Sequence, residues 1–169
     1  AISKDRGIVE LINSMNLLDP SFNLYIIGKW PKSNLLEECK KLPGWSKVQM
    51  LGYLSPDKIG DYINKSRIGI CTLYRLENFA YTTPVKSFEY LINGLPMIMT
   101  DFPFWKEFYA GTALFVDPYN PKDISKAIKQ LISDNDLYQN MSKKGHELAV
   151  NHCWENEEKK LIELYKNII

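Results

Sequence analysis

The sequence has little that would direct the chain to nucleic acid, to a membrane or to an oxidising compartment. Its 169 residues carry 21 basic and 20 acidic side chains, so the formal net charge is only +1. A chain so close to neutral has no general attraction for nucleic acid or for an anionic membrane surface. Its three cysteines, Cys39, Cys71 and Cys153, are odd in number and widely spaced, which does not fit a disulfide framework or a zinc site. We therefore expect a cytoplasmic protein.

Long apolar runs and clusters of metal ligands are also missing. No apolar run approaches the ~20 residues of a membrane-spanning helix, and no signal-peptide pattern occurs at the start. A peripheral association with the inner face of a membrane stays open. The two histidines, His146 and His152, lie in the C-terminal helical region and are interpreted as surface or packing residues, so we expect no metal.

What the sequence does contain is an alternation of strands and helices. With 45% hydrophobic and 24% charged residues, residues 1–169 have the size and composition of one globular domain. Strands are predicted at residues 22–28, 47–51, 67–73, 95–101 and 112–116, and helices at 6–18, 33–41, 56–66, 84–94, 104–109, 121–133, 137–150 and 155–168. The fold class is therefore α/β, a Rossmann-like, doubly wound parallel sheet flanked by helices, with extra helices at the C-terminus.

The beginning of the chain departs from this pattern. The strand expected before the first helix is reduced to residues 1–3 or is missing, and with it the sheet would have about six strands. Ala1 is also not a methionine. We interpret the sequence as a piece of a longer polypeptide, cut near the start of a domain. The alternative is simple processing of a complete small protein.

The ends of the predicted strands are the places to look for a ligand. Open parallel sheets bind ligands beyond the carboxyl ends of their strands. There the chain has Gly28 and Lys29 after one strand, and Gly52, Tyr53 and Leu54 after the next. Glycine would let a ligand approach the backbone closely, although each glycine taken alone also fits an ordinary turn.

The helix at residues 84–94 offers the best anion site in the sequence. Thr82 and Thr83 are placed to cap its first turn. The first amides of a helix have no partner inside the helix, so they are free to bind a phosphate. In this helix those amides belong to Val85, Lys86 and Ser87.

Glu89 is the unusual residue of this helix. An apolar stripe is formed by Val85, Phe88 and Ile92, and at about 100° per residue Glu89 lies only about 40° from Val85. A carboxylate is costly on a buried stripe unless something pairs with it. The residues alone allow either a simple i,i+3 ion pair with Lys86 or a role in binding a ligand.

A family resemblance favours the second possibility. The segment KSFEYLINGLPMIMTD, residues 86–101, resembles the motif of the group 1 glycosyltransferases, which are retaining enzymes of the two-domain GT-B fold. In that motif a Glu-containing helix is followed by a strand that ends in Ser/Thr-Asp. Other segments resemble the family in the same order: Arg6-Gly7, NLYIIGK (23–29), VQMLGYLSPDKIGDYINKSRIGI (48–70), Lys106-Glu107, VDPYNPKDISKAI (116–128) and His152-Cys153-Trp154-Glu155.

The resemblance implies a role for each matching residue. Glu89 would bind the ribose hydroxyls of a nucleotide-sugar, and Tyr53 and Leu54 would contact the base. Gly28 and Lys29 would also belong to the substrate site. With Glu89, the basic residues Lys86 and Arg6 would form the catalytic set, stabilising the departing phosphate without a metal or another cofactor. The residues that would meet the diphosphate are Arg6, Thr82, Thr83, Val85 and Lys86.

Two departures from the family pattern concern charged residues. The family has a second Glu eight positions before the ribose Glu, but that position is Tyr81 here, which we place in the substrate site although it is no carboxylate. Glu77 is the nearest acid upstream, and it either replaces the missing Glu or is an ordinary loop residue. A basic residue that is often found in the first loop is absent at Ala1, where Lys29 or Lys4 would have to replace it.

Several aromatic residues lie near the same strand ends. They either form a platform for a sugar or a base, or they pack the core and a lid. They are Tyr74, Phe79, Tyr81, Phe102, Phe104 and Trp105.

The resemblance implies that the chain is the C-terminal, donor-binding domain of a retaining glycosyltransferase, of the kind that serves polysaccharide biosynthesis. The complete enzyme would transfer a hexosyl group from a UDP- or GDP-sugar to a glycan or lipid-linked acceptor. The acceptor would bind an N-terminal domain that this chain lacks, so we expect the fragment alone to be inactive. The alternatives are a nucleotide-sugar epimerase of the same fold and a non-catalytic nucleotide-binding or interaction module, which Tyr81 favours. A dinucleotide oxidoreductase is disfavoured, because no G-x-G-x-x-G turn occurs.

Overall fold

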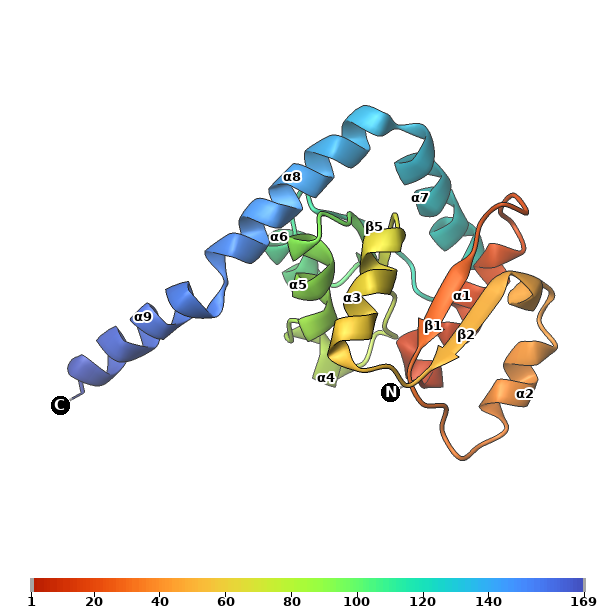
Figure 1. The fold of residues 1–169 in the computed structure, drawn as a ribbon, viewed down its shortest axis with the longest axis horizontal. Helices are drawn as coiled ribbons and strands as arrows, with labels where there is room; N and C mark the ends of the chain where they lie inside the picture. The colour runs from red at the N-terminus through yellow and green to blue at the C-terminus, as the bar shows by residue number, and fades with distance from the viewer. Residues whose placement is uncertain (1, 169) are drawn as a thin grey trace.

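Short parallel strands alternate with helices along the chain in the computed structural model, which describes residues 2–168 (Figure 1). The strands are β1 (Leu24–Ile27), β2 (Val48–Gly52), β3 (Gly69–Cys71), β4 (Met97–Thr100) and β5 (Ala113–Val116). The α-helices are α1 (Ile8–Met15), α2 (Leu35–Lys40), α3 (Pro56–Lys65), α4 (Glu77–Ala80), α5 (Val85–Ile92), α6 (Pro103–Phe108), α7 (Pro121–Ser133), α8 (Asn135–Asn151) and α9 (Trp154–Lys166). Two 3-10 helices, η1 (Lys4–Arg6) and η2 (Pro43–Lys47), complete the set. The α/β class and the parallel pairing predicted from the sequence are confirmed.

The strands form two sheets instead of the single sheet of about six strands that we predicted. β1 pairs with β2, and β4 lies between β3 and β5, all in parallel register. Within residues 2–168 there are five strands, and no ladder joins β1 to β3. Of the two possibilities for the strand before the first helix, reduced to residues 1–3 or missing, the described residues fit the second: residues 2 and 3 form no strand, and Ile2 N donates a long bond of 3.4 Å to Lys29 O. Ala1 lies outside the described residues.

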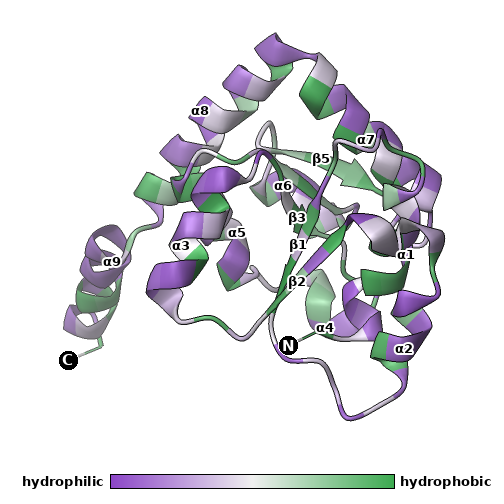
Figure 2. Ribbon diagram, turned by 45° about the vertical axis from the view of Figure 1, so that its right-hand side comes forward, coloured by the Kyte–Doolittle hydropathy of each residue, from purple (hydrophilic) through white to green (hydrophobic). Residues whose placement is uncertain are grey.

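β4 divides the main core into two halves. Successive strand residues point to opposite faces, and all four residues of β4 are buried. Ile98 faces a cluster built with α1 and α7, whereas Met97 and Met99 face a cluster built with α5 and α6. A third cluster lies between β1, α1 and α2. Hydrophobic residues follow the central strands, and the outer helices mix them with hydrophilic ones (Figure 2).

Two local features differ from the sequence-based prediction by more than a small shift of a helix or strand end. The helix expected at 6–18 is split at Gly7, whose φ of +68° ends η1 and precedes α1. A short helix, α4, lies where a loop was expected. Its four residues are too few to give the periodic pattern from which a helix can be recognised in a sequence.

The C-terminal helices α8 and α9 behave differently. α8 packs on α5, and α9 points away from the body of the molecule (Figure 1). In the described chain no residue of α9 is buried. Within residues 2–168 every helix is too short or too polar to cross a membrane.

Candidate functional site

The carboxyl ends of β1 and β2 bring together four of the predicted site residues. Gly28 N donates to the carbonyl oxygen of Gly52 (2.7 Å), which ties the two turns side by side. Lys29 follows, and its Nζ lies 5.2 Å from the centroid of the exposed Tyr53 ring. Leu54, the next residue in the chain, is half-buried. A cation beside an exposed aromatic ring is a surface on which a planar base could stack.

The amino end of α5 is open, though less so than predicted. The helix begins at Val85 with Pro84 as its N-cap, and no side chain caps it. Thr82 was predicted to be a cap, but its Oγ1 donates to Phe79 O (3.2 Å) instead, and the Ser87 amide donates to Pro84 O (2.9 Å). The predicted cap is therefore wrong, and the exposed Thr83 does not supply it either.

Two backbone donors remain at this helix start. The amides of Val85 and Lys86 have no hydrogen-bond partner among residues 2–168. With the positive end of the helix dipole, they would offer a bound anion two amides where three were expected.

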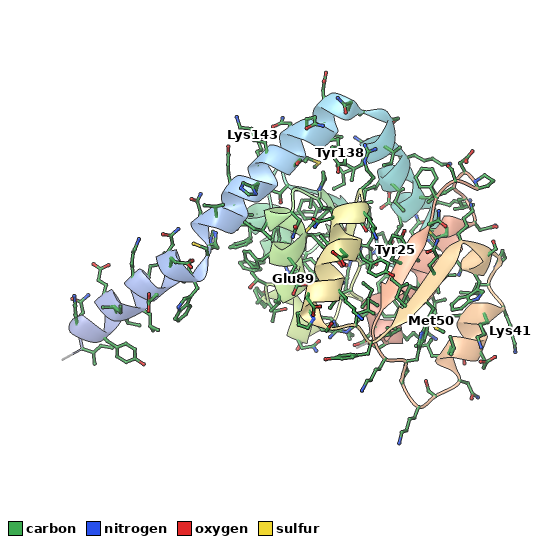
Figure 3. All side chains as sticks on the ribbon, in the orientation of Figure 1. Tyr25, Lys41, Met50, Glu89, Tyr138 and Lys143 are labelled. Carbon is green, nitrogen blue, oxygen red and sulfur yellow. The ribbon has the colours of Figure 1, made fainter. Side chains whose placement is uncertain are left out.

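Glu89 is exposed on α5, one turn after Val85 (Figure 3). Its carboxylate makes no hydrogen bond or ion pair with the described residues, and only its backbone oxygen is used, by Asn93 Nδ2 (2.8 Å). The expected apolar stripe is not the buried face, because Val85 is 75% exposed and Ile92 is exposed as well. Glu89 thus carries no burial cost and is free to bind a ligand.

Ser87 and Leu91 form the buried side of α5 instead. The Ser87 hydroxyl donates to Pro84 O (2.6 Å) and lies 2.7 Å from the hydroxyl of the fully buried Tyr109. Burial raises the pKa of Tyr109 to about 12, and the hydrogen bond between Tyr109 and Ser87 opposes that rise. The polar residue Ser87 is therefore accommodated in the core through two hydrogen bonds.

Replacing Tyr109 with phenylalanine is expected to lower the free energy of unfolding by about 1–2 kcal/mol at pH 8, because one buried hydrogen bond is lost. The free energy of unfolding of the variant should also fall less than that of the parent as the pH is raised above 10. A folded-state pKa of about 12, above the value near 10 in the unfolded chain, gives stability that is complete below pH 10 and lost as the pH rises through 12. Urea unfolding at pH 8, 10 and 11.5 measures both effects. Tyr165→Phe on α9 is the exposed control, and equal pH slopes for Tyr109→Phe and the parent would contradict the assignment.

Lys86 and Arg6 line one cavity between the two sheets. The Lys86 ammonium donates to Ile70 O in β3 (2.9 Å), so the i,i+3 pair with Glu89 considered from the sequence does not form. Arg6 is exposed at the end of η1. The structure therefore brings the two predicted phosphate-binding cations to the same place, but it engages Lys86 with the backbone.

The loop before α5 is anchored by Trp105. Its Nε1 donates to Thr82 O (2.7 Å), and the indole is fully buried. Tyr81, the residue before Thr82 in this loop, is 84% exposed, and Glu77 on α4 is exposed too. Of the aromatic set expected near these strand ends, Phe102 and Trp105 are core residues, which leaves Tyr81 as the exposed member of this loop.

An ion-pair cluster at the ends of β3, β4 and β5 was missed. Arg75 donates through Nε and Nη2 to Asp101 Oδ1 (3.0 and 2.8 Å), and its Nη1 lies 3.1 Å from Asp117 Oδ1. Tyr119 OH accepts from the Arg75 amide (3.0 Å). The hydrogen bond to Asp101 and the nearby carboxylates raise the pKa of Arg75. Each of these residues follows a strand, so the expectation that ligands bind beyond the carboxyl ends of parallel strands could have found them. That expectation does not distinguish a structural ion pair from a ligand contact.

Tyr74, which follows β3, links the end of that strand to α1 and to Tyr119. Its hydroxyl donates to Glu10 Oε1 (2.8 Å), and its ring packs on that of Tyr119 at 4.7 Å between centroids. Burial, followed by the bond to Glu10, raises the pKa of Tyr74. Tyr74 is therefore interpreted as part of the scaffold of the strand ends.

The histidines lie away from these strand ends. His146 Nδ1 is 3.0 Å from Ile92 O, and His152 Nδ1 is 3.0 Å from Leu148 O. Within residues 2–168 no three His, Cys, Asp or Glu side chains come together as metal ligands would. That the chain works without a metal stays a prediction.

Comparisons with known proteins agree on one architecture. A family model described as "Glycosyl transferases group 1" matches residues 1–148. Among solved structures, sucrose-phosphate synthase from Thermosynechococcus elongatus has a TM-score of 0.83 at 17% identity, over 98% of this chain and 43% of that one. HepE from Anabaena, in complex with UDP, has a TM-score of 0.83 at 14% identity, over 99% of this chain and 46% of that one.

An isolated domain matches as well. The C-terminal domain of the group 1 family protein LpcC from Francisella tularensis has a TM-score of 0.73 at 21% identity, over 89% of this chain and 81% of that one. A search of curated proteins gives no match. The chain spans less than half the length of the first two solved structures, and at these identities the likeness establishes the fold.

Proposed function

Because the chain belongs to the group 1 glycosyl transferases, we propose that it is the donor-binding domain of a retaining enzyme that transfers a sugar from a nucleotide-sugar to a glycan or lipid-linked acceptor. The observation that carries the proposal is the arrangement on α5. A free carboxylate, Glu89, lies one turn from two amides, of Val85 and Lys86, that have no partner among residues 2–168. A cis-diol and a diphosphate are the two groups that such an arrangement binds in one ligand.

The proposed chemistry is stabilisation of the leaving group. A diphosphate at the start of α5 would meet the helix dipole and the two free amides, with Arg6 close by. Tyr53 and Lys29 would hold the base at the ends of β1 and β2. These groups need no metal ion to offset the phosphate charge. The HepE structures that resemble this chain hold UDP or UDP-glucose, which supports a uridine nucleotide as the first donor to test.

A second domain is part of the proposal. The solved structures that match nearly the whole chain are more than twice as long as the matched part. The exposed apolar residues of α9, which include Trp154, Leu161 and Tyr165, would pack on that second domain. Alone, the chain is expected to bind a nucleotide weakly and to transfer nothing, because the acceptor site would lie elsewhere.

The nucleotide panel is the first test. Calorimetric titration with UDP, GDP and ADP is expected to give a dissociation constant near 1 mM for at least one of them, about −4 kcal/mol of binding free energy. The same nucleotide should not bind to a chain in which Arg6 is replaced by glutamate, since that change reverses a charge beside the phosphates. Absence of binding by all three at several millimolar would contradict the proposal.

The ribose assignment predicts that Glu89→Ala weakens binding at least about tenfold, because a hydrogen bond to a charged acceptor contributes about 1.5–3 kcal/mol. NMR titrations with the nucleotide and with its 2′,3′-dideoxy analogue measure the coupling. The dideoxy analogue should bind the parent and Glu89→Ala equally. Glu77→Ala, at another exposed acid of the neighbouring helix α4, is the control and should leave both affinities unchanged. If Glu89→Ala weakened the binding of both ligands equally, Glu89 would not bind the ribose hydroxyls.

A non-catalytic nucleotide-binding module is the second candidate, and one observation favours it. Tyr81, at the position where the family has an acid, is 84% exposed and presents no carboxylate. In a full-length protein that binds the nucleotide but does not transfer or hydrolyse the sugar, Tyr81→Glu is expected to restore activity if the missing acid is the cause.

A further inference from the structure

The residues directly after β3 fix both neighbours of Arg6. Before Arg6, Asp5 O accepts a hydrogen bond from Tyr74 N (2.8 Å). After Arg6, Gly7 lies so close to the strand end that a Cβ would overlap the carbonyl oxygen of Thr72. The position of the exposed Arg6 side chain therefore depends on where the residues after β3 lie.

Tyr74 joins these residues to α1 as well. Its hydroxyl donates to Glu10 Oε1 (2.8 Å). Glu10 Oε2 is buried and has no hydrogen-bond partner within residues 2–168. Loss of the bond from Tyr74 would leave both carboxylate oxygens without a partner in the described chain, which is costly for a group that is shielded from water. The Tyr74 side chain is thus held on α1, while its backbone amide holds η1.

Arg75, the next residue, fixes this segment to the ends of the other two strands. Its Nε and Nη2 donate to Asp101 Oδ1 (3.0 and 2.8 Å) after β4, and its Nη1 lies 3.1 Å from Asp117 Oδ1 after β5. Its amide donates to the hydroxyl of Tyr119 (3.0 Å), whose ring packs on that of Tyr74 at 4.7 Å between centroids. Arg75 is therefore bound through both its side chain and its backbone.

We propose that Arg75 is a positioning residue for Arg6. Its guanidinium fixes the residues after β3 to the ends of β4 and β5, and the bond from Tyr74 N to Asp5 O fixes η1 to the same residues. The link from Arg75 to η1 follows from these contacts alone. That Arg6 meets a phosphate rests on the proposed function.

The charges around Arg75 favour a positioning role over direct binding of a phosphate. One guanidinium faces two carboxylates, so negative charge is in excess, and it repels an anion. All three guanidinium nitrogens are engaged with these carboxylates. Arg6 makes no ion pair within residues 2–168, so its whole charge is left for a ligand.

The geometry of the guanidinium matters more than the strength of its ion pairs. The side chains of Arg75, Asp101 and Asp117 are 30–42% exposed, and ion pairs at such sites contribute little to stability. A planar guanidinium that contacts two carboxylates at once nevertheless fixes the orientation of the chain that bears it. Substitution of Arg75 should therefore displace the residues after β3 without unfolding the protein.

Hydrogen exchange tests the link without any ligand. In Arg75→Gln the Tyr74 amide, which donates to Asp5 O, should exchange at least about tenfold faster than in the parent chain. Asp101→Ala, which lies far from Tyr74 in the sequence, removes an acceptor of the guanidinium and should act in the same direction. An unchanged Tyr74 rate in both variants would overturn the proposal.

Two controls separate this effect from a general loosening of the strand. The Gly69 amide at the start of β3 donates to Pro96 O (3.0 Å) and should keep its exchange rate in both variants. Arg67→Gln is the matched variant, because Arg67 is an exposed arginine before β3, with its Cζ 4.8 Å from the centroid of the Tyr138 ring. It should leave the Tyr74 rate unchanged, and an equal acceleration by Arg67→Gln would contradict the proposal.

Double-mutant cycles with UDP distinguish positioning from direct contact. Arg75→Gln should weaken UDP binding about three- to tenfold in the parent chain, and it should have no further effect once Arg6 is replaced by glutamine. In the Glu89→Ala background it should have the same effect as in the parent. Arg75→Lys keeps the charge but not the planar fork, so it should restore only part of the affinity. An equal loss with and without the Arg6 side chain would mean that Arg75 contacts the ligand, and would overturn the proposal.

The exchange and binding measurements keep the two proposals apart. If UDP, GDP and ADP all fail to bind the parent chain, the proposed function fails, and the Tyr74 exchange rates still decide the link from Arg75 to η1. If UDP binds and the Tyr74 rate does not respond to Arg75→Gln or Asp101→Ala, the proposed function stands and the positioning role fails.

Discussion

Replacing Gly7 with alanine is expected to lower the free energy of unfolding by about 3–5 kcal/mol, the sum of backbone strain and overpacking. Gly7 has φ +68°, a conformation that alanine rarely adopts. A Cβ at this position would also overlap the carbonyl oxygen of Thr72 at the end of β3. Because that atom belongs to the backbone of a buried residue directly after β3, it has little freedom to move away. Urea unfolding followed by circular dichroism measures the loss.

Gly52 supplies a matched control for this prediction. It has the same φ of +68°, but a Cβ there would have no heavy atom within 4 Å. Gly52→Ala therefore carries the backbone strain without the overlap, and about 1 kcal/mol is expected. The difference between the two variants isolates the close approach of the first loop to β3. Equal losses would mean that this approach does not hold the loop in place.

The strands could be predicted from the sequence because each is a short apolar run with turn residues at its ends. All five predicted strands form; four are shorter than predicted, and β2 has the predicted length but is shifted by one residue. Their division into two sheets could not be predicted, since strand order depends on which edges meet in space. The pattern of residues along a strand does not show whether another strand pairs with each of its edges.

The face that α5 buries was predicted wrongly for a physical reason. Val85 and Ile92 are apolar and yet exposed, whereas the small polar residue Ser87 is buried through its bonds to Pro84 and Tyr109. Leu91 then packs against α8 at Gly145, where a Cβ would lie 2.6 Å from Leu91 Cδ2. A prediction from periodicity assumes that the apolar residues of a helix face the core. On α5 the buried face is set instead by the hydrogen bonds of Ser87 and by the space that Gly145 leaves for Leu91.

The candidate site could be predicted as a set of residues but not as a set of contacts. Lys29 and Tyr53 lie together, as expected for residues that follow neighbouring parallel strands. Glu89, which the helix pattern and the family resemblance singled out, follows the open start of α5. The engagement of Lys86 with Ile70 depends on the open edge of β3, and the ion pairs of Arg75 depend on the order of three strands. Both require the fold. Whether these residues bind a nucleotide stays a prediction.

Replacing Trp105 with alanine is expected to lower the free energy of unfolding by about 3–5 kcal/mol, the usual loss for a large buried aromatic side chain. The indole is fully buried and contacts Phe102 edge to face at 4.8 Å between centroids. Trp105→Phe keeps most of the packing but removes the bond to Thr82 O, so it should cost about 1–2 kcal/mol. Urea unfolding followed by far-ultraviolet circular dichroism avoids the change in tryptophan fluorescence.

The same substitutions distinguish the two roles of Trp105, which are packing in the core and holding the loop before α5 through its hydrogen bond to Thr82 O. Since Trp105 Nε1 holds Thr82 O, Trp105→Phe should loosen the loop before Val85 and speed exchange of the Thr82 amide, which donates to Phe79 O at 3.3 Å. Trp154→Ala on α9 is the control, because that side chain is 63% exposed and should change stability by no more than about 0.5 kcal/mol. If Trp105→Phe left this exchange unchanged, the indole would fill space only, and the position of the α5 amino end would have to depend on Pro84 and Ser87.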